Sequence, residues 1–352
     1  MHYTKLGRTG LSVSRLVLGT MNFGEYTTEP DAHLILDRAL EHGINFVDTA
    51  NMYGGAAGPG ITEEIIGRWF AKGDGRRERT VLATKLYNSM KGFGRTDNWP
   101  NTTLLSALNI RQSCDASLKR LQTDHIDLYQ MHHIDRGRPT TSQLDWLGTE
   151  RELVFPAHID PAPPWEEIWQ GMEQAMREGK ITYVGSSNFA GWNIAQANER
   201  ARWRGLVGLV SEQSVYSLVK RTVELEVVPA CRAYGVGLLP WSPLAGGLLA
   251  GGLEQAEVGS RRARKQVSAD QQAQVDKYVA LCRDLGAEPA VVALAWLLHN
   301  PAVTAPVVGP RTVAQLDGAV KALSLALDAD TLRRLDEIWP GPGNQAPEAY
   351  AW

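Results

Sequence analysis

The sequence has few cysteines and almost no surplus of charge. Its three cysteines, Cys114, Cys231 and Cys282, lack metal-site spacing and are odd in number, which argues against a disulfide framework and predicts a reducing compartment, the cytoplasm. Lys and Arg total 36 against 39 for Asp and Glu, a formal net charge of -3. No chain-wide positive field is available to hold nucleic acid or an anionic membrane, so we expect neither as a partner.

Long apolar runs are also missing. The longest helix-like run, VVALAWLL at 291–298, is far shorter than the roughly 20 residues of a membrane-spanning helix. Polar residues such as Arg8 and Arg15 interrupt the apolar residues near the N-terminus, which is not the pattern of a secretory signal. With 43% hydrophobic and 21% charged residues among 352, the composition predicts a soluble protein with a large core.

The phosphate- and metal-binding motifs of several enzyme classes do not occur. In place of a G-x-G-x-x-G turn, Gly235 and Gly237 are followed by Pro240 where the third glycine would stand, which argues against an open dinucleotide-binding sheet. There is no P-loop, H-x-H or H-E-x-x-H. His132 and His133 are adjacent in a predicted strand and would point to opposite faces, so we expect no metal site.

Short β-branched runs alternate with amphipathic segments of helical period along most of the chain. The predicted strands are 16–18, 45–47, 80–83, 126–130, 181–184, 209–212, 237–239 and 305–308, and the helices between them include 31–42, 62–71, 103–121, 165–178, 192–203 and 222–234. This alternation is typical of parallel βαβ units. Eight units predict an α/β fold, a closed (β/α)8 TIM barrel forming a single domain, 1–352, in preference to an open doubly wound sheet.

Three segments fall outside this repeat. Residues 136–164 carry five prolines and no clear periodicity, so we predict a long loop insertion there, with a short element near 144–147. Residues 246–265 are rich in glycine and then basic. Because loops that follow barrel strands lie at the C-terminal face, both segments are candidates for shaping a site. Residues 340–352 are predicted to be a free tail or, alternatively, a flap over the barrel mouth.

Ionisable side chains stand at or just after the ends of three predicted strands. Asp48 and Lys85 each follow a strand, Tyr53 comes five residues after Asp48, and His132 follows the fourth strand. In a barrel these ends converge. A buried Lys85 ammonium would favour ionised Tyr53, and Asp48 would compensate the lysine charge. His132 could polarise a carbonyl oxygen beside Tyr53. Together they predict a proton-transfer site, although each residue alone is more often structural.

A second group of polar and aromatic residues follows the later strands. Ser187, Asn188 and Gln213 bring hydroxyl and amide groups that could bind a carboxamide, and Trp241 offers a flat face for stacking. A nicotinamide ring has both features. The alternative is that Ser186 or Ser187 caps the following helix and that Trp241 fills the barrel.

An anion site is predicted after the eighth strand. Gly309 and Arg311 precede a helix that starts at Thr312, and a helix N-terminus with an arginine suits a phosphate monoester. The basic run 261–265 is either a solvated loop or a flap whose Arg261 closes over a pyrophosphate.

Seven motifs in this order resemble the aldo-keto reductase family, in the branch that includes the potassium-channel β-subunits. They are FVDTANMYG (46–54), LATK (82–85), IDLYQMH (126–132), VGSSNF (184–189), LVSEQSVYS (209–217), LPWSPLAGG (239–247) and VVGPRT (307–312). The resemblance starts at KLGRTG and covers nearly the whole length. It implies a TIM barrel that binds NADPH/NADP+ and reduces small carbonyl compounds.

The resemblance also implies roles for individual residues. Asp48, Tyr53, Lys85 and His132 match the family's catalytic tetrad, with Tyr53 as general acid. The implied cofactor contacts are Gly19, Thr20 and Met21 beneath the cofactor, Asp48, Ser187, Asn188 and Gln213 at the nicotinamide, Trp241 stacked on it, Ser242, Leu244 and Arg261 at the pyrophosphate, and Gly309, Arg311 and Gln315 around the adenosine phosphate and adenine. The expected substrate contacts are Tyr53, Tyr87, Trp99, His132 and Trp192.

Three positions depart from the family pattern. Gly252 stands where relatives often carry lysine, and Gly318 and Ala319 replace a Glu-Asn pair near the adenine. We therefore expect an NADPH-dependent enzyme that reduces aldehydes or ketones. The alternative is an NADPH-binding regulatory or redox-sensing partner protein with slow chemistry. The sequence leaves the physiological substrate and the oligomeric state open.

Overall fold

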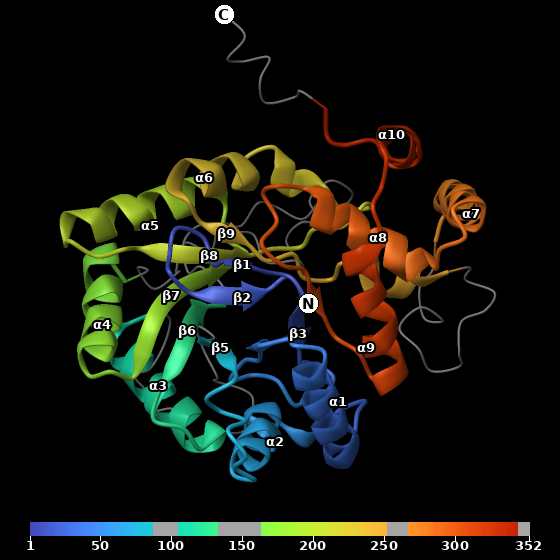
Figure 1. Cartoon of the computed structure of the whole chain (residues 1–352). Coiled ribbons are helices and arrows are strands. Elements are labelled where there is room, and N and C mark those ends of the chain that lie inside the picture. The colour runs from blue at the N-terminus through green and yellow to red at the C-terminus, as the bar shows by residue number, and fades with distance from the viewer. Residues whose placement is uncertain (87–104, 133–162, 252–266, 344–352) are drawn as a thin grey trace, which may run out of the picture.

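A computed structural model describes residues 1–86, 105–132, 163–251 and 267–343. At its centre lies a sheet of eight parallel strands in the order β10-β3-β4-β5-β6-β7-β8-β9 (Figure 1). These are β3 (Val17–Gly19), β4 (Phe46–Asp48), β5 (Val81–Leu86), β6 (Ile126–Met131), β7 (Ile181–Ser187), β8 (Leu209–Gln213), β9 (Gly237–Leu238) and β10 (Val307–Val308). A parallel bridge from Leu238 to Val303 and a 2.8 Å bond from Val307 N–H to Pro240 O join the two ends of the sheet. The predicted TIM barrel is confirmed.

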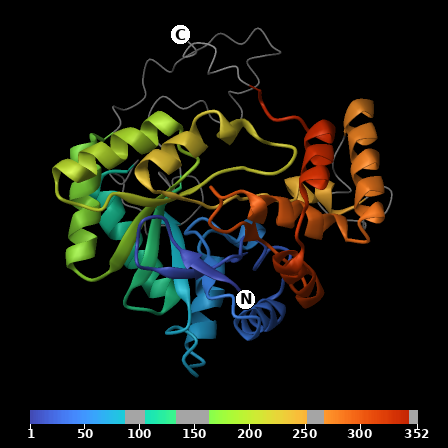
Figure 2. The same ribbon diagram turned by 45° about the horizontal axis from the view of Figure 1, so that its top comes forward.

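Helices surround the barrel (Figure 2). They are α1 (Glu29–Glu41), α2 (Ile61–Phe70), α3 (Ala107–Leu121), α4 (Trp165–Arg177), α5 (Gly191–Trp203), α6 (Val227–Tyr234), α8 (Pro289–His299) and α9 (Val313–Val320), with 3-10 turns at Gly55–Ala57, Thr222–Glu224, Ala245–Ala250 and Lys321–Ser324. Helices α7 (Ala269–Asp284) and α10 (Ala329–Ile338) pack side by side outside this ring in both views. None of the helices within the described ranges is long and apolar enough to cross a membrane.

The predicted elements are present, with shifted boundaries. The strand predicted at 181–184 continues as β7 through Ser187, and the one predicted at 305–308 is reduced to Val307–Val308. The helix predicted over 222–234 is wrong as a single element, because it divides into a 3-10 turn and α6. Pro229 explains the division: it lies in the first turn of α6, where a missing N–H is tolerated, but would lie inside one continuous helix.

The structure adds an N-terminal hairpin that we did not predict. Strands β1 (Tyr3–Lys5) and β2 (Ser12–Ser14) pair antiparallel and lie across one end of the barrel (Figure 1). Leu6 and Val13 are fully buried and pack into the cluster that fills the barrel interior. Gly7 has a φ of +53°, and a side chain there would overlap the carbonyl oxygen of Val210. The hairpin therefore covers one end of the barrel core.

Three predicted segments lie largely outside the described residues. They are the loop insertion at 136–164, of which only 163 and 164 are described, the basic run 261–265, and the tail at 340–352 beyond residue 343. The predictions for these segments stay predictions.

The contact between α2 and α3 gives a stability test. A Cβ atom on Gly67 of α2 would overlap the carbonyl oxygen of Arg120 at the end of α3. We expect Gly67→Ala to lower the free energy of unfolding by about 1–3 kcal/mol, because neither backbone can yield without strain. Gly318→Ala in α9 is the matched control, since its Cβ would meet nothing within 4 Å. It should stabilise the protein by about 0.4–1 kcal/mol. Equal effects in urea unfolding would contradict this account.

Candidate active site

The four residues of the predicted proton-transfer site meet at the carboxyl ends of neighbouring strands. Asp48 is the last residue of β4, Lys85 lies near the end of β5, and His132 directly follows β6. Parallel pairing brings these ends together, with Asp48 opposite Ala83 and Lys85 opposite Gln130. Tyr53 reaches the same place from the loop between β4 and α2.

A buried ion pair forms the centre of the site. Lys85 is fully buried, and its Nζ lies 2.5 Å from Asp48 Oδ2. The same Nζ donates to Thr49 O at 2.9 Å and to the Tyr53 hydroxyl oxygen at 3.2 Å. The lysine thus makes three hydrogen bonds, and one of them reaches the phenol. Desolvation of both charges is offset by their attraction and by these additional bonds.

The protonation states follow from burial and from this pair. Burial is the largest single influence on the pKa of Lys85 and lowers it, but the interactions with Asp48 and Tyr53 together outweigh burial, so the pKa is raised and the ammonium form is held. Burial raises the pKa of Tyr53; the Lys85 ammonium opposes this effect, and the net shift is upward. As we expected, the Lys85 ammonium favours the ionised phenol, but desolvation outweighs it, so the pKa of Tyr53 is not lowered toward neutral pH. The phenol keeps its proton and accepts a hydrogen bond from Lys85.

His132 faces the tyrosine. The two rings form an edge-to-face pair with centroids 5.8 Å apart and an angle of 80° between their planes. The main-chain N–H of His132 donates to Leu86 O at 2.9 Å, which fixes the segment after β6 against β5. The imidazole and the phenol are therefore placed to contact one small group together. His133 lies outside the described residues.

Sequence reasoning missed Gln130, which fixes the other oxygen of the aspartate. Gln130 Nε2 donates to Asp48 Oδ1 at 2.9 Å, and Gln213 Nε2 donates to the same oxygen at 3.0 Å. Both glutamines are buried. The sequence did show a glutamine inside the predicted strand IDLYQM. Its role could be recognised only once the structure placed Asp48 next to it.

The predicted nicotinamide residues lie together beside the tetrad. Ser187 and Gln213 are register partners at the ends of β7 and β8, and Ser187 Oγ donates to Gln213 O at 2.8 Å. Asn188 has a φ of +61°, and its Oδ1 accepts the Trp241 Nε1–H at 3.0 Å. The alternatives are wrong: Ala190 is the N-cap of α5, and Trp241 is 36% exposed and fills no core.

Glu212 is the second residue that sequence reasoning missed. This fully buried carboxylate accepts hydrogen bonds from Ser186 Oγ, from Ser214 Oγ at 2.6 Å and from the Phe189 N–H at 3.1 Å. Burial raises its pKa, although these donors oppose the shift. It ties the turn that holds Asn188 in a left-handed conformation to the end of β8.

The turn after β3 is hydrogen-bonded to the main chain of Asp48. Thr20 donates to Asp48 O through both its N–H, at 3.0 Å, and its hydroxyl, at 2.9 Å. A Cβ on Gly19 would lie 2.7 Å from a methyl of Val307, so only glycine fits between β3 and β10. Met21 is exposed at this turn. Gly19, the last residue of β3, pairs with Asp48, and Thr20 and Met21 follow it directly.

The predicted pyrophosphate loop has an unusual backbone. Positive φ angles occur at Ser242, Ala245, Gly246 and Gly247, with Leu244 between them at -98°. Main-chain bonds within the loop hold this conformation, from the Ala245 N–H to Ser242 O at 2.8 Å and from the Gly247 N–H to Leu244 O at 2.9 Å. The phosphate contacts predicted for Ser242 and Leu244 stay predictions.

The predicted adenosine-phosphate residues lie at the start of α9. Thr312 is the N-cap, and its hydroxyl accepts the Gln315 N–H at 3.2 Å. The Arg311 N–H donates to Gln315 Oε1 at 2.8 Å, while Asn22 Nδ2 donates to Gly309 O at 2.7 Å. The loop after β10 is thus anchored to the loop after β3.

The remaining predicted contacts are not joined to the tetrad by this structure. Tyr87, Trp99 and Arg261 lie outside the described residues. Trp192 lies in the first turn of α5 and is 53% exposed, with its N–H donating to Glu226 Oε1 at 3.1 Å. Among the described residues there is no group of three or more His, Cys, Asp or Glu side chains that could hold a metal ion.

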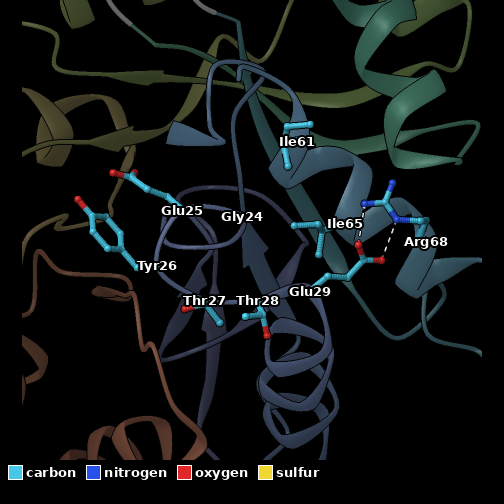
Figure 3. Close-up of a pocket in the computed structure, with 9 residues that line it drawn as sticks. All are labelled: Gly24, Glu25, Tyr26, Thr27, Thr28, Glu29, Ile61, Ile65 and Arg68. Atoms are coloured by element: carbon cyan, nitrogen blue, oxygen red, sulfur yellow. Dashed lines mark hydrogen bonds and ion pairs between the residues drawn. The ribbon is translucent and has the colours of Figure 1, made fainter. Parts of the chain in front are cut away.

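A cavity of about 330 Å³ lies between the loop after β3 and helix α2 (Figure 3). Its wall includes Tyr26, Ile61, Ile65 and the ion pair of Arg68 with Glu29, whose Nε–Oε1 distance is 2.8 Å. No residue of the tetrad lines this cavity. This cavity therefore does not contain the reacting groups.

Comparison with known proteins identifies the family. The model of the aldo/keto reductase family matches residues 15–340, so the chain belongs to this family and is an oxidoreductase. It is 49% identical to the uncharacterized oxidoreductase YrpG of Bacillus subtilis over the full length of both chains. It is 34% identical to Protein tas of Escherichia coli over 96% of this chain and 97% of that protein. It is 30% identical to a versiconal hemiacetal acetate reductase of Aspergillus parasiticus over 96% of each.

Family membership confirms the resemblance drawn from the motifs. Membership of the branch that includes the potassium-channel β-subunits stays a prediction, as does the identity of the cofactor. The tetrad residues meet at the carboxyl ends of the strands, while the predicted roles of these residues, of the amide group and of Arg311 stay predictions.

The raised pKa of Glu212 gives a pH test. The folded chain keeps this proton at a pH where the unfolded chain has released it, so the free energy of unfolding should fall as pH rises from the ordinary glutamate pKa toward the raised value. Glu212→Gln removes this contribution, and urea unfolding at several pH values should show a flatter dependence. Glu78→Gln makes the same change on the exposed surface and serves as the control. An unchanged slope in Glu212→Gln would contradict the assignment.

Proposed function

We propose that this protein is an NADPH-dependent carbonyl reductase that converts an aldehyde or ketone group of a small molecule to an alcohol, with Tyr53 as the proton donor. The observation that carries the proposal is the 3.2 Å contact between Lys85 Nζ and the Tyr53 hydroxyl, inside a site where Asp48 holds the lysine. A protonated phenol beside a fixed ammonium is a suitable general acid, because the ammonium stabilises the phenolate left after proton transfer.

The residues around the tetrad fit a nicotinamide cofactor. Trp241 presents an accessible indole face, and its Nε1–H bond to Asn188 fixes the orientation of that face. Ser187, Asn188 and Gln213 supply hydroxyl and amide groups that can bind a carboxamide. When bound, the cofactor supplies the hydride. The protein would orient the ring and hold a proton, on Tyr53, for the carbonyl oxygen.

The phosphorylated form of the cofactor is favoured by the start of α9. Arg311 stands next to the Thr312 N-cap, where the N–H groups of the first helical turn and a guanidinium can share one phosphate. We therefore propose NADPH/NADP+ as the cofactor. Gly252, Gly318 and Ala319 do not supply the side chains that relatives often place nearby, so Arg311 carries most of this preference.

Tyr53 and His132 divide the work at the carbonyl oxygen. The edge-to-face arrangement of the two rings leaves both able to point a donor toward one oxygen atom. His132 orients that oxygen, and Tyr53 releases its proton to it. Lys85 then stabilises the phenolate, and Asp48 keeps the lysine charged.

Tyr53→Phe tests the proton donor. The variant keeps the ring and loses the hydroxyl, so multiple-turnover NADPH oxidation with a panel of aldehydes should fall by about 10²–10⁴-fold. The Kd for NADPH should stay close to that of the parent protein. Tyr3→Phe is the matched control. It removes the hydroxyl by which Tyr3, in the N-terminal hairpin, donates to Gly43 O. Retained turnover in Tyr53→Phe would reject the assignment. Negligible turnover by the parent protein with intact NADPH binding would favour the regulatory alternative.

Lys85→Met tests the role of the ammonium. Without it the pKa of Tyr53 rises further, so the phenol becomes a poorer acid and turnover should be lost, while NADPH still binds. Because this change leaves Asp48 buried without its counter-ion, the folded state could be lost as well. The double variant Asp48→Asn with Lys85→Met removes both charges and separates the two effects. Normal turnover in a folded Lys85→Met protein would contradict the mechanism.

A further inference from the structure

The ring of Tyr26 lies beneath the guanidinium of Arg311. The guanidinium carbon is 4.3 Å from the ring centroid, well inside the range of a cation–π contact. Tyr26 is 39% exposed and belongs to the turn between β3 and α1. Although it lines the cavity of Figure 3, its ring points away from Ile61, Ile65 and Arg68 on the opposite wall.

The turn that carries Tyr26 is built to hold the ring in place. The N–H groups of Tyr26 and Thr27 both donate to Asn22 O, at 2.9 and 3.0 Å. The Asn22 side chain in turn donates to Gly309 O at 2.7 Å, and Thr27 Oγ1 donates to Arg311 O at 3.5 Å. Two loops about 285 residues apart in the sequence are therefore bonded around the contact between the ring and the guanidinium.

The hydrogen bonds near Arg311 involve its main chain, and its guanidinium contacts the ring of Tyr26. Its main-chain N–H is bonded to Gln315 Oε1. No carboxylate among the described residues forms an ion pair with its guanidinium. A guanidinium that lies flat on an aromatic face keeps its N–H donors in the plane of the group, where they can still bind a phosphate in a bidentate manner.

We propose that Tyr26 is a specificity-determining positioning residue, which holds the Arg311 guanidinium ready for the phosphate that distinguishes NADPH from NADH. This inference rests on the proposed function. Without the ring, Arg311 must be ordered when the cofactor binds, and the loss of side-chain freedom reduces the affinity. Only ligands with the additional phosphate use Arg311, so only their affinity depends on Tyr26.

The test measures the Kd values of NADPH, NADH and 2′,5′-ADP for the full-length protein by titration calorimetry. Tyr26→Ala should weaken NADPH and 2′,5′-ADP by about two- to fivefold, the range of an exposed cation–π contact, and leave NADH unchanged. Tyr26→Phe keeps the aromatic face and should bind all three ligands as the parent does. Tyr26→Leu fills a similar space without a π-face and should behave as Tyr26→Ala, which separates the ring from simple packing.

A double-mutant cycle completes the test. In an Arg311→Met background, Tyr26→Ala should cause no further loss of NADPH affinity, because the residue through which it acts is gone. Equal weakening of NADPH and NADH by Tyr26→Ala, or no weakening of either, would overturn the inference and leave the proposed function intact. A parent protein that binds neither nucleotide would instead refute the proposed function.

Discussion

The buried ion pair of Asp48 and Lys85 is the interaction on which the rest of the site depends. Two unpaired charges at this depth would destabilise the barrel by several kcal/mol each, so both must be satisfied completely. Lys85 is satisfied by Asp48, Thr49 O and Tyr53, and Asp48 by Lys85, Gln130 and Gln213. These partners come from β4, β5, β6 and β8 and from the loop after β4. The complete set of bonds to the pair, which includes Gln213 from β8, can therefore form only when the barrel brings these strands together.

The same requirement connects the tetrad to the residues predicted to bind nicotinamide. Gln213 bonds Asp48 on one side and is tied through its carbonyl oxygen to Ser187 and Asn188 on the other. Asn188 then bonds Trp241. One continuous set of hydrogen bonds therefore runs from Tyr53 to Trp241 and holds these side chains in place. Such preorganisation is the main contribution a protein can make to a reaction of this kind.

The barrel and the grouping of the tetrad could be predicted because both depend on local patterns, namely short β-branched runs and the polar residues that follow them. Asp48, Lys85 and His132 follow β-branched runs, and parallel strands bring their ends together whatever lies between them. Gln130 and Glu212 were missed because an inward-facing polar residue in a strand gains meaning only from partners across the barrel. Lys85 acts on the pKa of Tyr53 in the predicted direction, but the larger, opposing effect of burial was missed because the depth of burial is not visible in a linear order. The hairpin of β1 and β2 was missed because three-residue strands carry no clear period.

The central claim is that this arrangement lets a hydride and a proton reach one carbonyl group. Its most direct test is a reaction of the enzyme with an aldehyde and NADPH that carries deuterium at the transferable position of the nicotinamide. The account predicts an alcohol with one deuterium on the carbinol carbon and an unlabelled hydroxyl proton that comes from solvent through Tyr53. Deuterium that washes into water, or an alcohol formed without label on carbon, would contradict it.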